Sequence, residues 1–192
     1  MRTVAWMRKH CDVVVFTGDW HAYGDREIDT VAPDATKGTY PPHCMGLSPD
    51  ETERTGAAII ADIAPGADAL ILERDATPDD ARRVAREAVG TRRPVFVLKS
   101  EFSVFEGNGA ANEFVHALRD ALGGTPEFVV CGVATDVCVK QVVDGLLDRH
   151  AQVRVVTDAT WGLGLLGPSD TFDLWAGRGA LLSEVGQLSD GA

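Results

Sequence analysis

The sequence contains the stretch Phe128-Val129-Val130-Cys131-Gly132-Val133-Ala134-Thr135-Asp136-Val137-Cys138-Val139, in which an apolar run leads through a glycine into a helical pattern. A short, continuous run of β-branched and apolar residues is typical of a strand that is buried on both faces. Gly132 permits a sharp turn after this strand, because glycine adopts backbone conformations that other residues avoid. We expect Thr135 to cap a helix over about residues 135–150, which carries one apolar stripe. The stretch therefore predicts a strand, a tight connection and a helix.

The same alternation of apolar runs and helical patterns recurs along the chain. Apolar runs occur at residues 13–16, 69–72, 95–98, 128–131 and 153–156, and further helical patterns at about 77–89 and 111–122. This alternation predicts an α/β fold: a doubly wound, mostly parallel, Rossmann-like sheet with helices on both faces, in three layers. The segment from about Gly18 to Gly66 shows little periodicity. A long irregular segment within a domain is either a surface insertion or a functional loop.

The composition indicates a globular protein with an acidic balance. The 192 residues carry 18 basic and 29 acidic side chains, a formal net charge of -11, and 45% are hydrophobic. This charge argues against nucleic acid and anionic membrane surfaces as partners. No apolar stretch has the length of a membrane span, and the first residues do not resemble a signal peptide. We expect one cytoplasmic domain, residues 1–192, with its 4 cysteines as thiols.

Three potential metal ligands lie in the irregular segment. Asp19 and His21 directly follow the first apolar run and project to the same side of an extended chain. His43 follows two prolines that hold the backbone extended. One carboxylate and two imidazoles suit zinc, manganese or iron, and a fourth contact would come from Glu27 or Asp25. The residues leave open the alternative that Asp19 caps a turn and His21 lies on the surface.

Cys138 and Lys99 are the candidate catalytic residues. Cys138 falls in the first turn of the expected helix, where unpaired backbone N–H groups and the helix dipole favour a thiolate. The same N–H groups would stabilise an oxyanion formed when the thiolate attacks a carbonyl group. Lys99 ends the apolar run at 95–98, and a lysine there can stabilise negative charge. The alternatives are a buried structural cysteine and a lysine whose ammonium group reaches solvent.

The chain resembles the isochorismatase-like cysteine hydrolases, and within them the nicotinamidase-related branch. The matching motifs are Asp19-Trp20-His21, Tyr40-Pro41-Pro42-His43-Cys44-Met45, Lys99-Ser100-Glu101-Phe102-Ser103-Val104-Phe105 and Gly132-Val133-Ala134-Thr135-Asp136-Val137-Cys138-Val139. They occur in the order of the family and span most of the chain. The resemblance implies hydrolysis of a small amide such as nicotinamide to the acid plus ammonia, a reaction of NAD salvage.

The resemblance also implies roles for individual residues. Cys138 would form a thioester with the substrate, and Lys99 would be the second member of an Asp-Lys-Cys triad. A cis peptide is implied at Val133–Ala134, with the amides of Ala134 and Cys138 as the oxyanion hole. Tyr40 would lie against the substrate ring. A divalent metal ion, often zinc, is implied for Asp19, His21 and His43, with Glu27 as a further ligand in some relatives.

The amino end departs from the family pattern. Family members begin with a strand that carries the triad aspartate, whereas here Thr3 to His10 matches the end of the helix that follows it. We therefore expect an N-terminally short domain that lacks the family's first central strand and its aspartate, unless the coding sequence begins upstream of Met1. One alternative function is a catalytically silent scaffold for binding or oligomerisation. Another is an isochorismatase or ureido-amide hydrolase, against which the metal ligands argue. Relatives commonly form homo-oligomers, but no interface can be recognised in the sequence.

Overall fold

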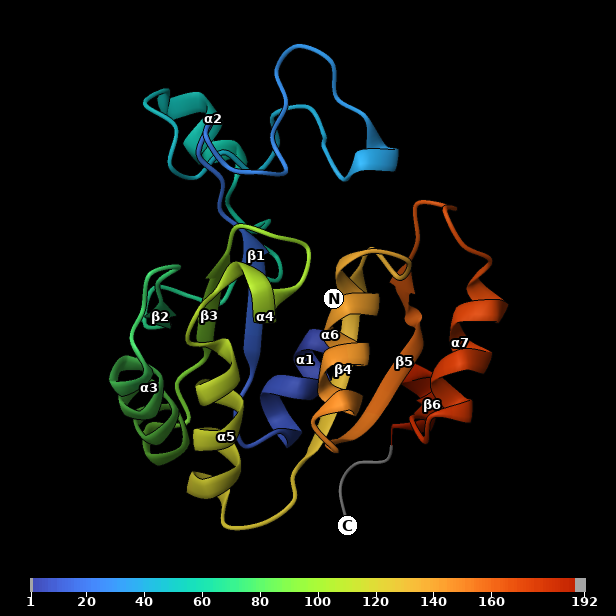
Figure 1. The fold of residues 1–192 in the computed structure, drawn as a ribbon. Helices are drawn as coiled ribbons and strands as arrows, with labels where there is room; N and C mark the ends of the chain where they lie inside the picture. Colours follow the sequence, from blue (N-terminus) through green and yellow to red (C-terminus); the bar gives the residue numbers. More distant parts are fainter. Residues whose placement is uncertain (1, 189–192) are drawn as a thin grey trace. The chain divides into compact units, whose positions relative to one another are not determined.

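The structure, a computed structural model, describes residues 2–188 of the chain. Its residues divide into two compact units, one of residues 13–117 and the other of residues 1–12 together with 118–192. Each unit contains a parallel sheet with helices packed against it (Figure 1). No helix within residues 2–188 has both the length and the apolar character that crossing a bilayer requires.

The sheet of the first unit buries its central strand completely. It consists of β1 (Val15–Asp19), β2 (Leu70–Leu72) and β3 (Val95–Lys99), in the order β1-β3-β2. Both pairings are parallel, and all five residues of β3 are buried. The register sets Asp19 opposite Lys99, so the two candidate site residues stand at the same edge of the sheet.

Two of the predicted helices, α3 (Pro78–Thr91) and α5 (Ala111–Leu122), follow the sequence signals closely. α3 begins at a capping box of Thr77 and Asp80 and packs against β2. α4 (Val104–Gly107) packs against β3, and α5 has the bounds that the sequence predicts.

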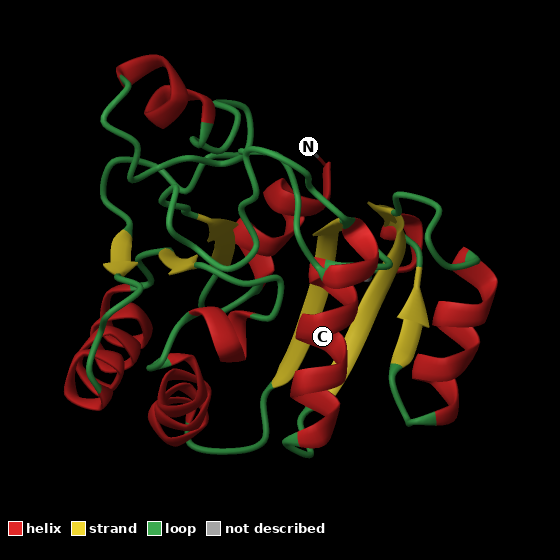
Figure 2. Ribbon diagram, turned by 45° about the horizontal axis from the view of Figure 1, so that its top comes forward, coloured by secondary structure: helices red, strands yellow, loops and turns green. Residues whose placement is uncertain are grey.

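The second unit repeats the strand and helix alternation. Its sheet has the order β4-β5-β6, formed by β4 (Glu127–Val133), β5 (Gln152–Trp161) and β6 (Leu181–Ser183). Figure 2 shows these strands running in the same direction, in agreement with their parallel pairing. α6 (Cys138–Asp148) packs against β4 and β5, and α7 (Pro168–Gly177) packs against β6. The unit also contains α1 (Arg2–His10) and a 3₁₀ turn, η2 (Val185–Gln187).

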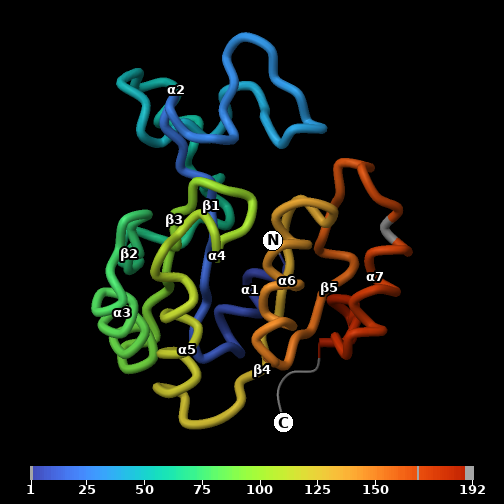
Figure 3. The backbone as a smooth tube through the Cα atoms, viewed as in Figure 1, coloured from blue at the N-terminus to red at the C-terminus, as the bar shows by residue number. Residues whose placement is uncertain are grey.

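The segment after β1 is irregular, as the sequence predicts. It forms the blue to teal loops that precede β2 in Figure 3. Its only regular pieces within the described chain are η1 (Ala35–Lys37), α2 (Glu51–Gly56) and an isolated bridge between Ile28 and Tyr40. The segment belongs to the first unit, so any ligands it carries are held beside β1 and β3.

Two features differ from the sequence expectations. Thr135 is not a helix cap: α6 begins at Cys138 after Val137, and the Thr135 N–H instead donates to the Trp161 carbonyl at 3.0 Å. The predicted strands are divided between two sheets within residues 2–188, with β1 and β4 each paired on one side only. No strand precedes β1 in this described part.

Candidate active site

The edge of the first sheet holds a buried ion pair. Lys99 Nζ donates to Asp19 Oδ1 and, at 3.0 Å, to the carbonyl oxygen of Glu101. Lys99 is only 1% exposed. Burying an ammonium group is costly unless it is paired and hydrogen-bonded, which these two acceptors achieve. The alternative of a lysine that reaches solvent is therefore wrong.

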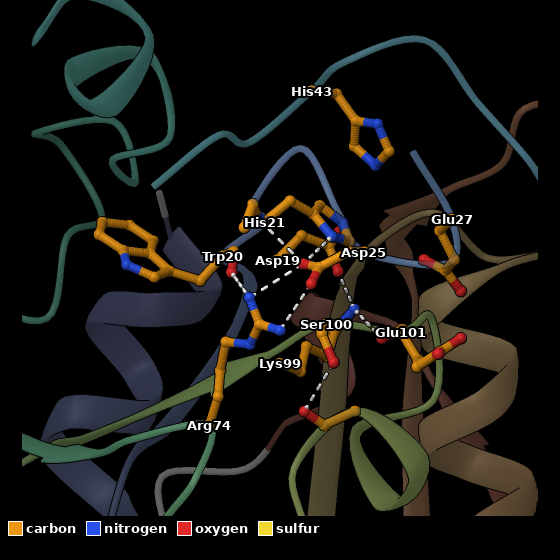
Figure 4. Close-up of polar contacts among 12 residues, drawn as sticks. Asp19, Trp20, His21, Asp25, Glu27, His43, Arg74, Lys99, Ser100 and Glu101 are labelled. Carbon is orange, nitrogen blue, oxygen red and sulfur yellow. Dashed lines mark hydrogen bonds and ion pairs between the residues drawn. The ribbon is translucent and has the colours of Figure 1, made fainter. Parts of the chain in front are cut away.

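Three predicted metal ligands converge at the same edge. Within residues 2–188, Asp19, His21 and His43 each offer a ligand atom, and these atoms all lie within 4.8 Å of one another. The rings of His21 and His43 are 4.8 Å apart between centroids. Figure 4 shows both imidazoles above the Asp19 carboxylate. His21 is 0% exposed, so the alternative of a surface histidine is wrong.

Backbone hydrogen bonds bring the two histidine segments together. The His21 N–H donates to the Cys44 carbonyl at 2.8 Å, and the Leu47 N–H donates to the His21 carbonyl at 3.0 Å. Cys44 has a left-handed backbone with φ 47°, which turns the chain directly after His43. Gly46 then passes so close to the Trp20 ring that a Cβ would lie 2.1 Å from it. Glycine is therefore required where this loop crosses the Asp19-Trp20-His21 segment.

The donor set fits a divalent metal ion. His21 Nε2 is buried without a hydrogen-bond partner, and burial lowers the pKa of the ring, so it is held neutral. A buried, unpartnered nitrogen is costly, and coordination of a metal would satisfy it. His43 Nδ1 lies 2.8 Å from the Pro41 carbonyl, which only accepts, so Nδ1 is the donor and Nε2 is the nitrogen available to a metal ion. Two imidazoles and a carboxylate suit zinc and similar ions.

The two further predicted ligands lie outside this cluster. Glu27 is 5% exposed, and its Oε1 accepts the Phe102 N–H at 2.8 Å while Oε2 has no partner. Burial raises the pKa of Glu27 to about 7. The Asp25 carboxylate contacts Nδ1 of His21 at 3.2 Å, on the opposite edge of the ring from the unpartnered Nε2.

An aromatic wall adjoins the cluster. Tyr40 meets Phe102 edge to face with 5.0 Å between ring centroids, and it lies 6.2 Å from the His43 ring. Backbone bonds between Tyr40 and both Glu27 and Asp29 fix its position, at 2.8 and 2.9 Å. Sequence reasoning singled out Tyr40 but not Phe102, which the Lys99-to-Phe105 motif contains.

Arg74 is a second residue that sequence reasoning missed. Its guanidinium group binds the Asp25 carboxylate and the Trp20 carbonyl. Arg74 follows the apolar run at 69–72, so the rule that selected Lys99 at a strand's carboxyl end would also have found it.

Cys138 belongs to the second unit, where it begins α6 and is half-buried. The Ala134 carbonyl accepts the N–H groups of Val137 and Val139, both at 3.0 Å. The peptide bond between Val133 and Ala134 is cis, which confirms that prediction. Cys138 therefore lies at the N-terminus of α6, directly after this turn.

Asp136 binds a neighbouring loop through its carboxylate. Its carboxylate accepts the N–H groups of Leu163 and Leu165 at 2.9 and 2.7 Å. Although burial alone would raise its pKa, these bonds hold the pKa of Asp136 below its usual value. Asp136 therefore anchors the loop after β5 instead of lying within the first turn of α6.

Comparison with known proteins identifies the family. A model of the isochorismatase domain matches residues 73–180. The chain belongs to the isochorismatase family. This match confirms the family that the sequence motifs indicate, which is a family of hydrolases. A search of curated proteins finds no match.

Solved structures of isochorismatase-like hydrolases share the three-layer α/β fold. Nicotinamidase from Bacillus subtilis is 18% identical, with a TM-score of 0.59 over 95% of this chain and 80% of that one. N-carbamoylsarcosine amidase from Thermoplasma acidophilum is 21% identical, with a TM-score of 0.60 over 98% and 86%. Pyrazinamidase from Pyrococcus horikoshii, solved in complex with zinc, is 20% identical, with a TM-score of 0.56 over 90% and 75%. The predicted fold class is confirmed.

Proposed function

We propose that this member of the isochorismatase family is a metal-dependent cysteine amidohydrolase that converts a small amide, such as nicotinamide, to the acid plus ammonia. The observation that carries the proposal is the convergence of Asp19, His21 and His43 beside the buried Lys99. Nicotinamidases among the structural relatives and zinc in the pyrazinamidase complex support it.

In the proposed reaction Cys138 is the nucleophile. The Cys138 thiol gives up its proton and the thiolate attacks the amide carbon; the C–N bond breaks, and the amide nitrogen takes up the proton that the thiol lost and leaves as ammonia. Water then adds to the thioester, the C–S bond breaks, and the acid and the thiol are released. The backbone amides of Ala134 and Cys138 are proposed to stabilise the oxyanion, since preorganised N–H donors at a helix start suit that charge.

Other residues are proposed to bind and orient the substrate. Lys99, fixed by Asp19, would stabilise negative charge, and Tyr40 would contact the substrate ring, with Val133 and Ala134 lining its amide end. Asp19, His21 and His43 would hold a divalent metal ion, which supplies a Lewis acid when bound. Glu27 is kept as a proposed further ligand through its unpartnered Oε2.

We also propose the setting in which the enzyme works. Residues 1–192 would act as one hydrolase domain in the cytoplasm, as a homo-oligomer of the kind that relatives form. The net charge of -11 disfavours nucleic acid and anionic membranes as partners.

Ammonia release from a panel of amides tests the proposal. Zinc-loaded protein is offered nicotinamide, pyrazinamide and an N-carbamoyl amino acid, and the chelator-treated protein is the control. We expect ammonia from the aromatic amides, loss of release with chelator, and recovery when zinc is restored. Release from the N-carbamoyl substrate alone would assign a ureido-amide hydrolase, and release from no amide would reject the proposal.

The second candidate is a catalytically silent scaffold. The resemblance implies an aspartate that moves the proton, and none of the four matching motifs contains it. A shuttle of this kind typically contributes about 10²–10⁴-fold in rate. If Cys138 reacts with a thiol reagent no faster than glutathione does, the scaffold is favoured.

A further inference from the structure

We propose that Asp25, clamped by Arg74, is a positioning residue that fixes the tautomer of His21 so that Nε2 faces the metal site. The inference rests on the proposed metal site and concerns two residues to which neither the sequence motifs nor the family resemblance gives this role. Asp25 and Arg74 lie 49 positions apart and meet beside His21 (Figure 4).

The Asp25 carboxylate is held on both oxygens. Arg74 donates to Oδ2 at 2.9 Å and to Oδ1 at 2.8 Å, a two-point contact between planar groups. The Ala22 N–H donates to Oδ2 at 2.9 Å. The side chains of Asp25 and Arg74 are 12% and 22% exposed, so the pair is largely shielded from solvent. Bidentate arginine–carboxylate pairs are among the stronger and more directional contacts in proteins.

This clamp determines which nitrogen of His21 carries the proton. Asp25 Oδ2 lies 3.2 Å from His21 Nδ1. A carboxylate that is bound by a guanidinium group and a backbone N–H is ionised, so towards the ring it can only accept. His21 Nδ1 therefore donates its proton to Asp25. In a neutral imidazole the lone pair then lies on Nε2.

The lone pair is left where the metal ligands converge. His21 Nε2 is the buried nitrogen without a hydrogen-bond partner, and His21 is one of the three clustered residues. The opposite tautomer would place a proton at Nε2 and a lone pair against the Asp25 carboxylate. Histidine ligands commonly donate their second N–H to a carboxylate, which orients the ring and raises its basicity.

Arg74 also fixes the backbone between the first two ligands. Its guanidinium group donates to the Trp20 carbonyl at 2.8 Å, and Trp20 stands between Asp19 and His21. Arg74 thus holds the segment that carries Asp19 and His21 in two ways, through the Asp25 side chain and through the Trp20 carbonyl. Fixing a ligand in advance lowers the entropy lost when the metal binds.

Zinc affinity tests the inference without any need for catalysis. Zinc is titrated into the purified full-length chain in competition with a chromophoric chelator. We expect Asp25→Ala to weaken zinc binding about 10–100-fold. Asp25→Asn keeps an acceptor oxygen and should lose less, and Arg74→Gln should fall between wild type and Asp25→Ala. The matched control is Asp29→Ala, which removes a carboxylate that accepts the N–H groups of Val31 and Ala32 in the same segment. We expect it to bind zinc as wild type does.

The tautomer itself is the second readout. Long-range ¹H–¹⁵N correlation spectra of the metal-free protein distinguish Nδ1–H from Nε2–H in a neutral histidine. We expect Nδ1–H for His21 in the wild type and in Asp29→Ala, and a mixture of tautomers in Asp25→Ala. An Nε2–H signal in the wild type, or unchanged zinc affinity in folded Asp25→Ala, would overturn the inference. Wild-type protein that binds no zinc but shows Nδ1–H would instead reject the proposed metal site and retain the role of Asp25.

Discussion

At the scale of the residue, the four cysteines have different surroundings. Burial raises the pKa of Cys11, Cys44 and Cys131, so these remain protonated thiols near neutral pH. Cys138 instead begins a helix. The thiolate is the reactive form, so we predict that iodoacetamide modifies Cys138 first, as measured by peptide mass spectrometry over time. Earlier modification of any of the other three would contradict the proposed nucleophile.

Glu27 predicts how stability depends on pH. Its pKa is about 7 in the folded protein against an ordinary 4.5. Between these values the folded state holds more protons than the unfolded state, so stability falls as the pH rises from 4.5 through about 7. Glu27→Gln keeps the acceptor for the Phe102 N–H but cannot ionise. We expect it to be about 1–3 kcal/mol more stable than wild type above that window and equal below it.

Denaturant unfolding in the presence of a chelator measures this difference. The chelator removes any metal, so the comparison reports the carboxyl group alone. An equal stability difference between the two proteins at acidic and alkaline pH would show that Glu27 is not the titrating group.

At the scale of the element, Asn108 joins two strands to a helix. It is 1% exposed, and its Nδ2 donates to the carbonyls of Leu98 and Glu73, both at 2.9 Å. Its Oδ1 accepts the Ala110 N–H at 3.0 Å. Asn108→Asp removes the donor and sets a carboxylate against carbonyl oxygens. We expect a loss of about 3 kcal/mol or more in the free energy of unfolding at neutral pH.

The control for Asn108 is Gln141 on α6, whose side chain is exposed. Gln141→Glu should change stability by no more than about 0.5 kcal/mol. Thermal unfolding of both variants makes the comparison, and equal effects would contradict the linking role of Asn108.

The loop that carries His43 can pass beside the Trp20 ring only because Gly46 has no side chain. A Cβ there would lie 2.1 Å from the Trp20 ring, so the ring or the loop must move. We expect Gly46→Ala to cost about 1–3 kcal/mol of stability and to weaken zinc binding, because Trp20 lies between two proposed ligands. Gly24→Ala, in the same segment with no atom within 4 Å of its Cβ, should leave both unchanged. Matched unfolding and zinc titrations check the pair.

Local signals predicted most elements, and tertiary contacts account for those they missed. The bounds of α5 and the Thr77 cap of α3 follow from periodicity and capping chemistry. The start of α6 was placed too early, because Thr135 looks like a cap but its N–H pairs with Trp161. β6 and α7 gave no clear periodic signal; β6 is held by its pairing with β5.

In the candidate site too, the sequence predicted the local motifs but not the contacts between distant segments. Motif spacing identified Asp19, His21 and His43, which the structure brings together. It did not predict that Asp19 also pairs with Lys99, since that contact depends on the register between β1 and β3. Nor did it predict the role of Asp25, because the Arg74 contact spans 49 positions.

At the scale of the whole molecule, the proposed chemistry draws on both units. The first unit carries the clustered ligands and Lys99, and the second carries Cys138. The proposal that both take part in one reaction rests on membership of the isochorismatase family and on the four motifs that resemble it, one of which contains the proposed nucleophile Cys138.

Hydroxylamine trapping tests the proposed role of Cys138 as the nucleophile most directly. Zinc-loaded protein is supplied with the best amide of the panel, with and without hydroxylamine, and both ammonia and hydroxamic acid are quantified for wild type and Cys138→Ala. We predict that hydroxylamine diverts part of the wild-type product to the hydroxamate, because it intercepts a thioester, and that Cys138→Ala yields neither product. Ammonia release by Cys138→Ala at the wild-type rate would contradict the account.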